Sequence, residues 1–159
     1  HAIDPGLSYG ISPSGVWADR RSQAQGSDTS GGFESYYAAY ADSRKWVKEE
    51  WVDYICPQVY WYIGHPSMDY ETIVRWWADV VKGTEVSLYI GMADYRAGNP
   101  DPESPWHGTD AIRQQLELNA SLPQVDGEAH FRYQFLAQDQ ALTELYREFY
   151  AQEAAPPQQ

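Results

Sequence analysis

The feature that most constrains the fold is a fourfold alternation of strand-like and helix-like segments. Strands are expected at residues 7–12, 53–61, 86–93 and 128–136, and helices at residues 33–51, 70–82, 110–121 and 140–152. Alternation of this kind implies parallel strands joined by right-handed helical crossovers. Four such βα units amount to half of a (β/α)8 TIM barrel. A small open parallel sheet with helices on both faces is the alternative α/β architecture.

The unit around residues 44–61 shows the pattern most clearly. An amphipathic helical stretch leads into the apolar run from Tyr54 to Trp61, which is rich in β-branched and aromatic residues and predicts a buried strand. Pro57 lies inside that run, so we expect a local irregularity there. Long polar loops follow the strands and short returns follow the helices, and this asymmetry favours the barrel, whose functional loops lie at the carboxyl ends of the strands.

Composition limits the partners and cofactors. The 159 residues fit one domain, residues 1–152, followed by a tail, residues 153–159, with too little apolar content to fold. A net charge of −12 argues against nucleic acid as a partner, and no apolar run reaches the length of a membrane span. Cys56 is the only cysteine, which excludes an intrachain disulfide and a cysteine-rich zinc site, and we expect a buried thiol. No metal or cofactor is expected.

Aromatic and hydrogen-bonding side chains gather where the expected strands end. Aromatic faces suit the apolar C–H faces of sugars, and amides, carboxylates and Arg suit their hydroxyls, so these residues predict a carbohydrate groove. Packing in the core is the alternative for each of them. The candidate substrate-binding residues are Trp17, Gln58, Tyr60, Trp61, Tyr95, Trp106 and Tyr133, with Ser12, Arg96 and Gln134 beside them.

Only one acid, Asp94, lies at an expected strand end, and it is the single catalytic candidate. Hydrolysis of a glycosidic bond requires two carboxyl groups, and the sequence shows no second one at this end of the strands. Phosphate-binding loops, a GxSxG elbow and an HExxH motif are absent. His65 and His107 lie in loops that follow strands, where either could contact a ligand.

Several blocks, in order, resemble the C-terminal half of the glycosyl-hydrolase-like family 10 proteins. These blocks are SYGISPSGVW, YADSRKWVKEEWVDYICPQVYW, WWADVVKGTEVSLYIGMADYR and ALTELYREFY. The resemblance implies a (β/α)8 barrel of which this chain supplies the last four units. It also implies an exported, extracytoplasmic bacterial protein that acts on glycans, with some members acting on peptidoglycan stripped of its stem peptides.

Two departures from the family pattern affect the expected activity. The sequence HFRYQFL stands where the family tends to have aromatic-Ser-Tyr-Lys, and Asp94 stands where members often carry a small residue. The family's acidic strand-end motif belongs to the preceding half of the barrel. We therefore expect part of a glycoside hydrolase-like enzyme that supplies groove residues and is inactive alone; a non-catalytic carbohydrate-binding module is the alternative. We also expect association, either with the missing N-terminal half or with a second copy.

Overall fold

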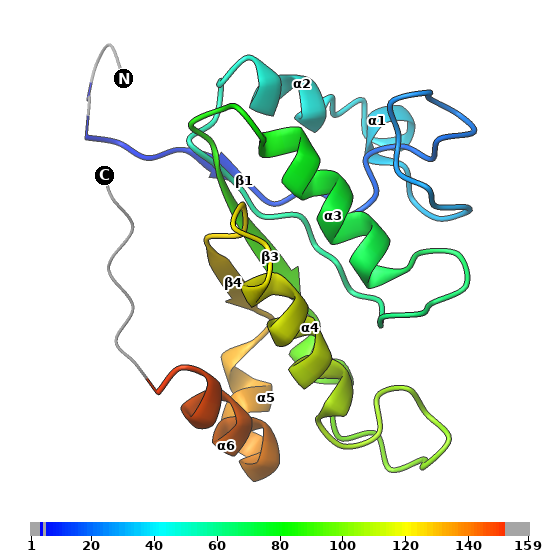
Figure 1. Ribbon diagram of the computed structural model, residues 1–159, viewed down its shortest axis with the longest axis vertical. Coiled ribbons are helices and arrows are strands. Elements are labelled where there is room, and N and C mark those ends of the chain that lie inside the picture. The colour runs from blue at the N-terminus through cyan, green and yellow to red at the C-terminus, as the bar shows by residue number, and fades with distance from the viewer. Residues whose placement is uncertain (1–3, 5, 152–159) are drawn as a thin grey trace.

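A computed structural model describes residue 4 and residues 6–151, and the expected tail at residues 153–159 lies outside the described residues. Strands and helices alternate along the chain (Figure 1). The elements are β1 (Gly10–Ile11), α1 (Ser35–Ala38), α2 (Ser43–Lys48), β2 (Tyr54–Ile55), α3 (Tyr70–Val81), β3 (Ser87–Met92), the 3-10 turn η1 (Asp94–Arg96), α4 (Asp110–Ala120), β4 (Gly127–His130), α5 (Tyr133–Gln138) and α6 (Gln140–Phe149).

The four strands form one parallel sheet in the order β1-β2-β3-β4. Each connection moves one strand further in the same direction. Because parallel crossovers are right-handed, an order without reversal places successive helices on the same face of the sheet. A sheet with helices on both faces requires a reversal of strand order, so the sequential order is consistent with part of a barrel and does not favour the open-sheet alternative.

The core lies between the sheet and its helices. Ile55, Leu88 and Ile90 from the strands are fully buried, as are Trp77 of α3 and Leu116 of α4. Burying one such aliphatic or aromatic side chain stabilises the fold by roughly 1.5–3 kcal/mol. The opposite face of the strands is less covered, with the rings of Tyr54 and Tyr89 in edge contact at 5.9 Å.

The loops that follow the strands extend to one side of the molecule, and the returns from helix to strand lie on the other (Figure 1). The loop at residues 12–34 is tied to α3, because Trp77 Nε1 donates a hydrogen bond to the Gly15 carbonyl and Trp76 Nε1 donates one to the Gln25 carbonyl. The loop expected to be polar therefore contributes to the core through Val16, which is 1% exposed.

The strands expected at residues 7–12 and 53–61 are reduced to the two-residue strands β1 and β2, and two other expected elements change in kind. The single helix predicted at residues 33–51 is two short helices, because Tyr40 between them adopts a left-handed backbone with φ of 52°. The fourth strand, predicted at residues 128–136, ends at His130, and α5 begins at Tyr133. The alternating aromatic residues after His130 imitate a strand, but Phe135 turns back to lie 6.0 Å from the ring of Tyr95.

Other expectations are confirmed. Pairing of β2 stops at Ile55 before Pro57 and resumes as isolated bridges at Gln58. Asp69 caps α3 by accepting a hydrogen bond from the Thr72 amide. Cys56 is a buried free thiol.

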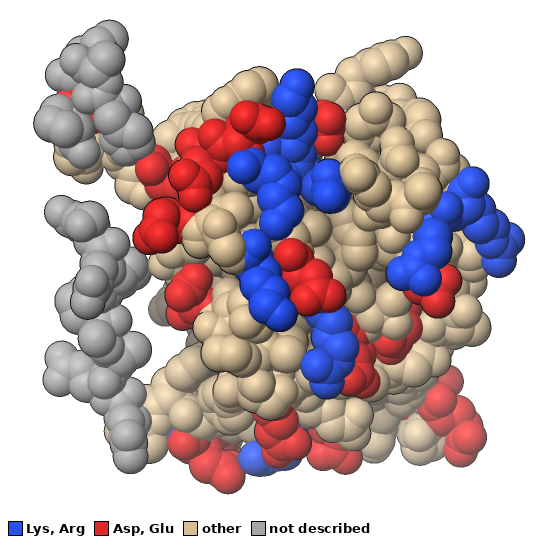
Figure 2. Space-filling view, turned by 45° about the horizontal axis from the view of Figure 1, so that its top comes forward, with Lys and Arg blue, Asp and Glu red and all other residues tan. Residues whose placement is uncertain are grey.

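Acidic and basic side chains lie next to one another across the face drawn in Figure 2, so that face carries no broad basic surface of the kind that binds nucleic acid. Within the described part of the chain, no helix has the length and apolarity needed to cross a bilayer.

Candidate functional site

A cleft with a volume of about 490 Å³ opens where the loops leave the carboxyl ends of the first three strands. It is lined by Ser14, Phe33, Gln58, Tyr60, Trp61, Tyr95 and Arg96. Another cavity, lined by the returns at residues 81–87 and 123–126, lies at the opposite end of the strands. Because function in parallel βα folds lies at the carboxyl ends, the first cleft is the candidate site.

Gln58 forms part of the cleft lining between the ends of β1 and β3. Its amide Nε2 donates to the carbonyl of Ser12 at 3.0 Å and lies 3.3 Å from the Ser12 hydroxyl. Its backbone bridges Ser14 on one side and Gly91 on the other. No described residue donates a hydrogen bond to the side-chain oxygen Oε1 of Gln58, so that oxygen is available to accept one from a ligand hydroxyl.

An aromatic wall formed by Tyr60, Tyr95 and Phe131 stands beside Gln58. Ring centroids are 6.0 Å apart for Tyr60 and Tyr95, 6.2 Å for Tyr60 and Phe131, and 6.4 Å for Tyr95 and Phe131. Tyr95 is 39% exposed and Phe131 48% exposed, so their rings remain accessible. Burial, together with the nearby Cys56, raises the pKa of Tyr60, so its phenol stays neutral and can donate a hydrogen bond.

Arg96 supplies the cation of the cleft. Its guanidinium lies 5.3 Å from the ring centre of Tyr95 and 5.8 Å from that of Trp106, and its Nε donates to the Tyr95 hydroxyl at 3.2 Å. None of the ion pairs among the described residues includes Arg96. The two rings fix the guanidinium at the cleft without neutralising it.

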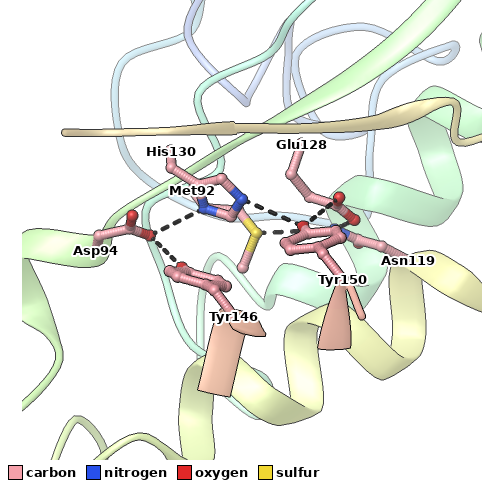
Figure 3. Close-up of polar contacts among 7 residues, drawn as sticks. All are labelled: Met92, Asp94, Asn119, Glu128, His130, Tyr146 and Tyr150. Carbon is pink, nitrogen blue, oxygen red and sulfur yellow. Dashed lines mark hydrogen bonds and ion pairs between the residues drawn. The ribbon is translucent and has the colours of Figure 1, made fainter. Parts of the chain in front are cut away.

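Asp94 belongs to a buried network with His130 and Tyr146 (Figure 3). Its side chain has no exposed surface, and Oδ1 accepts a hydrogen bond from the Tyr146 hydroxyl at 2.7 Å and lies 3.3 Å from Nδ1 of His130. Burial and the negative charge of Asp94 raise the pKa of Tyr146 above its ordinary range, which keeps the phenol protonated as a donor. In this arrangement Asp94 connects the end of β3 to α6, and its side chain is closed to solvent.

The other end of the same network is a second carboxylate, Glu128 of β4 (Figure 3). Glu128 accepts hydrogen bonds from the Tyr150 hydroxyl at 2.7 Å and from the Asn119 amide at 3.1 Å, and Nε2 of His130 lies 3.2 Å from the same hydroxyl. Burial and the charge of Glu128 raise the pKa of Tyr150. Both carboxylates therefore have partners on the helix-covered side of the sheet, away from the cleft lining.

The structure brings together only part of the predicted site. Four of the seven candidate substrate-binding residues line the cleft, together with Arg96, which was expected beside them: Gln58, Tyr60, Trp61 and Tyr95. Trp106 is 7% exposed behind Arg96, while Trp17 is 2% exposed and stacks on Trp76 in the core at 5.8 Å. Tyr133 is 82% exposed on α5 and is not part of the cleft lining.

Sequence reasoning did not assign Ser14, Phe33 or Phe131 to the site. Phe33 follows a long loop, and its carbonyl accepts from the Ser14 hydroxyl at 3.3 Å, a contact with no sequence signal. Phe131 directly follows the short β4 and could have been found if that strand had been ended at His130. Among the described residues, no cluster of three or more His, Cys, Asp or Glu is arranged to hold a metal ion.

The profile described as Glycosyl hydrolase-like 10 matches residues 1–107. Because this match covers more than half of the chain, the protein belongs to that family. Glycosyl hydrolase DigH of Escherichia coli (strain K12) is 41% identical over 143 residues, which cover 87% of this chain and 32% of DigH. Glycosyl hydrolase YngK of Bacillus subtilis (strain 168) is 39% identical over 152 residues, which cover 91% of this chain and 29% of YngK. The chain thus spans about a third of the length of these relatives.

Proposed function

We propose that this chain supplies the substrate groove of a glycoside hydrolase-like enzyme that acts on bacterial cell-wall glycans, such as peptidoglycan strands, or on related glycans. The observation that carries the proposal is the aromatic cleft with hydrogen-bonding groups at the carboxyl ends of the parallel strands. Aromatic rings offer faces for the C–H side of a sugar, and Gln58 and Tyr60 offer an acceptor and a donor for its hydroxyls. The relatives' description as glycosyl hydrolases supports this assignment.

The barrel is the second part of the proposal. The sheet ends at β1 on one side and at β4 on the other, and the strand order is sequential. Four sequential parallel strands are half of a (β/α)8 barrel, and open edges of this kind are normally paired or covered. We assign the chain to the C-terminal half, partnered by an N-terminal half-barrel or by a second copy. Location outside the cytoplasm rests on the family resemblance alone.

Catalytic carboxylates are assigned to the partner half. Glycoside hydrolysis needs two carboxyl groups beside the scissile bond, and the cleft lining contains none. Asp94 is fully buried by its side chain and is engaged by Tyr146. A non-catalytic carbohydrate-binding module is the second candidate, favoured by this same lack of a carboxylate in the lining.

The test is a binding and activity assay of this chain on peptide-free peptidoglycan strands and a panel of polysaccharides. Binding is measured by calorimetry, and cleavage by new reducing ends. We expect binding without cleavage. Trp61→Ala should weaken binding roughly tenfold, since a central aromatic contact in an interface contributes about 1–2 kcal/mol or more. Trp51→Ala is the matched control, because Trp51 is exposed and does not line the cleft.

Three results would contradict parts of this proposal. Absence of binding to every glycan would remove the groove assignment. Cleavage that is lost in Asp94→Asn would show that the buried carboxylate is catalytic and that the partner half is dispensable. Light scattering that finds this chain to be a monomer at all concentrations, both alone and when mixed with an N-terminal half-barrel, would contradict the proposed association.

A further inference from the structure

We infer that the cleft selects a sugar that carries a carboxylate and that Arg96 is the residue that binds this group. The inference rests on the proposed glycan groove and goes further by assigning the charge of its ligand. Arg96 is the only charged side chain among the described residues that line the cleft. The whole chain has a formal net charge of −12, so its overall field disfavours an anionic ligand, and local attraction must come from a cation at the site.

The guanidinium is held in a geometry suited to a planar anion. Contacts with Tyr95 and Trp106 restrict its rotation, and the hydrogen bond to the Tyr95 hydroxyl uses Nε. The Nη groups make no ion pair with an acid among the described residues. A guanidinium presents parallel N–H groups that match the two oxygens of a carboxylate, and a restrained one loses little entropy when that bond forms.

The remaining lining fits the neutral part of the same sugar. Ser14, Gln58 and Tyr60 provide hydroxyl and amide groups, and Phe33 and Trp61 provide aromatic surface. No acid in the lining opposes a carboxylate on the ligand. A uronic acid and a sugar bearing a lactyl ether present the same carboxylate chemistry, and the choice between them depends on the length of the arm between ring and carboxylate.

The experiment compares acidic probes with their neutral forms. Trigalacturonic acid is paired with its methyl ester, and a disaccharide that contains muramic acid is paired with its lactyl amide. Affinities of the chain are measured by calorimetry at low salt. We expect one acidic probe to bind about tenfold more tightly than its neutral form, because hydrogen bonds between charged groups are stronger than those to a neutral ester or amide. The pair that shows the preference identifies the source of the carboxylate.

Variants assign the preference to Arg96. In Arg96→Gln the acidic and neutral probes should bind within twofold of each other. Arg96→Lys should retain a smaller preference, because lysine keeps the positive charge but lacks the paired N–H groups of the guanidinium. Arg132→Gln is the matched control, since Arg132 also lies over aromatic rings, at 5.9 Å from Phe131 and Phe135, but does not line the cleft. It should retain the full preference.

The outcomes separate the two proposals. Equal binding of acidic and neutral probes by the unmodified chain would overturn the role of Arg96 and leave the glycan groove standing. A preference that survives in Arg96→Gln would also overturn it. If no glycan in the panel binds, the groove and the inference fail together.

Discussion

The hydrogen bond from Tyr146 to Asp94 provides the sharpest test of whether that carboxylate is structural. Tyr146→Phe removes one oxygen atom and leaves the ring in place. In the structure the hydroxyl donates to Oδ1 of Asp94 at 2.7 Å, and Tyr146 is only 6% exposed. The remaining partner of that oxygen is His130 at 3.3 Å, while Oδ2 has no hydrogen-bond partner among the described residues. The variant therefore leaves a buried carboxylate with one weaker contact.

The expected cost follows from burial. A hydrogen bond to a charged group contributes about 1.5–3 kcal/mol, and water cannot replace the donor at a site without exposed surface, so we expect a loss near 2–3 kcal/mol. This corresponds to a decrease in Tm of roughly 4–12 °C in a domain of this size. Tyr150→Phe is the control. Tyr150 makes the equivalent bond to Glu128 at 2.7 Å but is 44% exposed, so water can substitute and the cost should stay near 0.5–1 kcal/mol.

The assay is urea unfolding at one fixed protein concentration, since association would otherwise change the apparent stability. The slope of the transition should be the same for both variants. In an Asp94→Asn background, the cost of Tyr146→Phe should decrease, because the charge that the hydroxyl stabilises is gone. A loss below about 1 kcal/mol, or equal losses for Tyr146→Phe and Tyr150→Phe, would refute the view that Tyr146 stabilises a buried Asp94.

Two further changes test how the loops around the cleft are held. Gly15→Ala should destabilise by roughly 1–3 kcal/mol in thermal unfolding, because a Cβ at Gly15 would lie 2.7 Å from the backbone oxygen of Gln58. Asp69→Ala should cost about 1–2 kcal/mol at neutral pH by removing the cap of α3, where Asp69 accepts from the Thr72 amide at 2.9 Å. Burial alone would raise the pKa of Asp69, but hydrogen bonds from the surrounding amides and from the hydroxyl of Thr72 outweigh it and lower the pKa. The difference in unfolding free energy between the unmodified chain and Asp69→Ala is therefore fully present above the ordinary carboxyl pKa near 4. It disappears as the pH falls through the lower pKa that Asp69 has in the folded protein.

Each of these changes has a control on the same sheet or helix. Gly127→Ala should be close to neutral, since its Cβ would only reach ordinary contact with Tyr89 at 3.5 Å. If Gly127→Ala destabilises the protein as much as Gly15→Ala, the close approach of the Gln58 backbone to Gly15 does not explain the loss of stability. For the cap, Glu71→Ala tests a nearby carboxylate that pairs with Arg75 at the surface, and it should change stability by less than about 0.5 kcal/mol at any pH.

Local sequence signals predicted some elements well. Helix α3 begins after the Asp69 cap and ends at Val81, shortly before Gly83 with its φ of 79°, and β3 falls inside its predicted run. Both elements have a regular pattern of apolar residues and clear signals at their ends, so residues near in sequence are enough to predict them. The residues after His130 lack such signals. Their alternation of aromatic and polar side chains fits a strand as well as a turn into a helix, and contacts with Tyr95 decide for the helix.

The lining of the candidate cleft could be predicted where position along a strand decides it, but not where contact with a distant segment decides it. Gln58 and Tyr60 line the cleft because the strand they follow ends there. Trp17 stacks on Trp76 of α3, which lies far from it in the sequence. The residues around Trp17 give no signal that predicts this contact. Likewise, Asp94 is covered by Tyr146 of α6, fifty-two residues away.

The alternation of side chains along β3 explains why this strand places no carboxylate in the cleft. Ile90 and Met92 are fully buried toward the helices, and their register partners on β4 are Glu128 and His130, so these positions face the helix-covered side. Asp94, in the 3-10 turn η1 that follows the strand, also meets His130 on that side. The odd-numbered positions face the other way, and from residue 89 to residue 95 they are Tyr, Gly, Ala and Tyr. A carboxylate at an odd-numbered position at the end of β3 would have faced the cleft. If the proposed groove belongs to a glycan-cleaving site, strand β3 does not supply its acids, and the proposal above assigns them to the other half of the barrel.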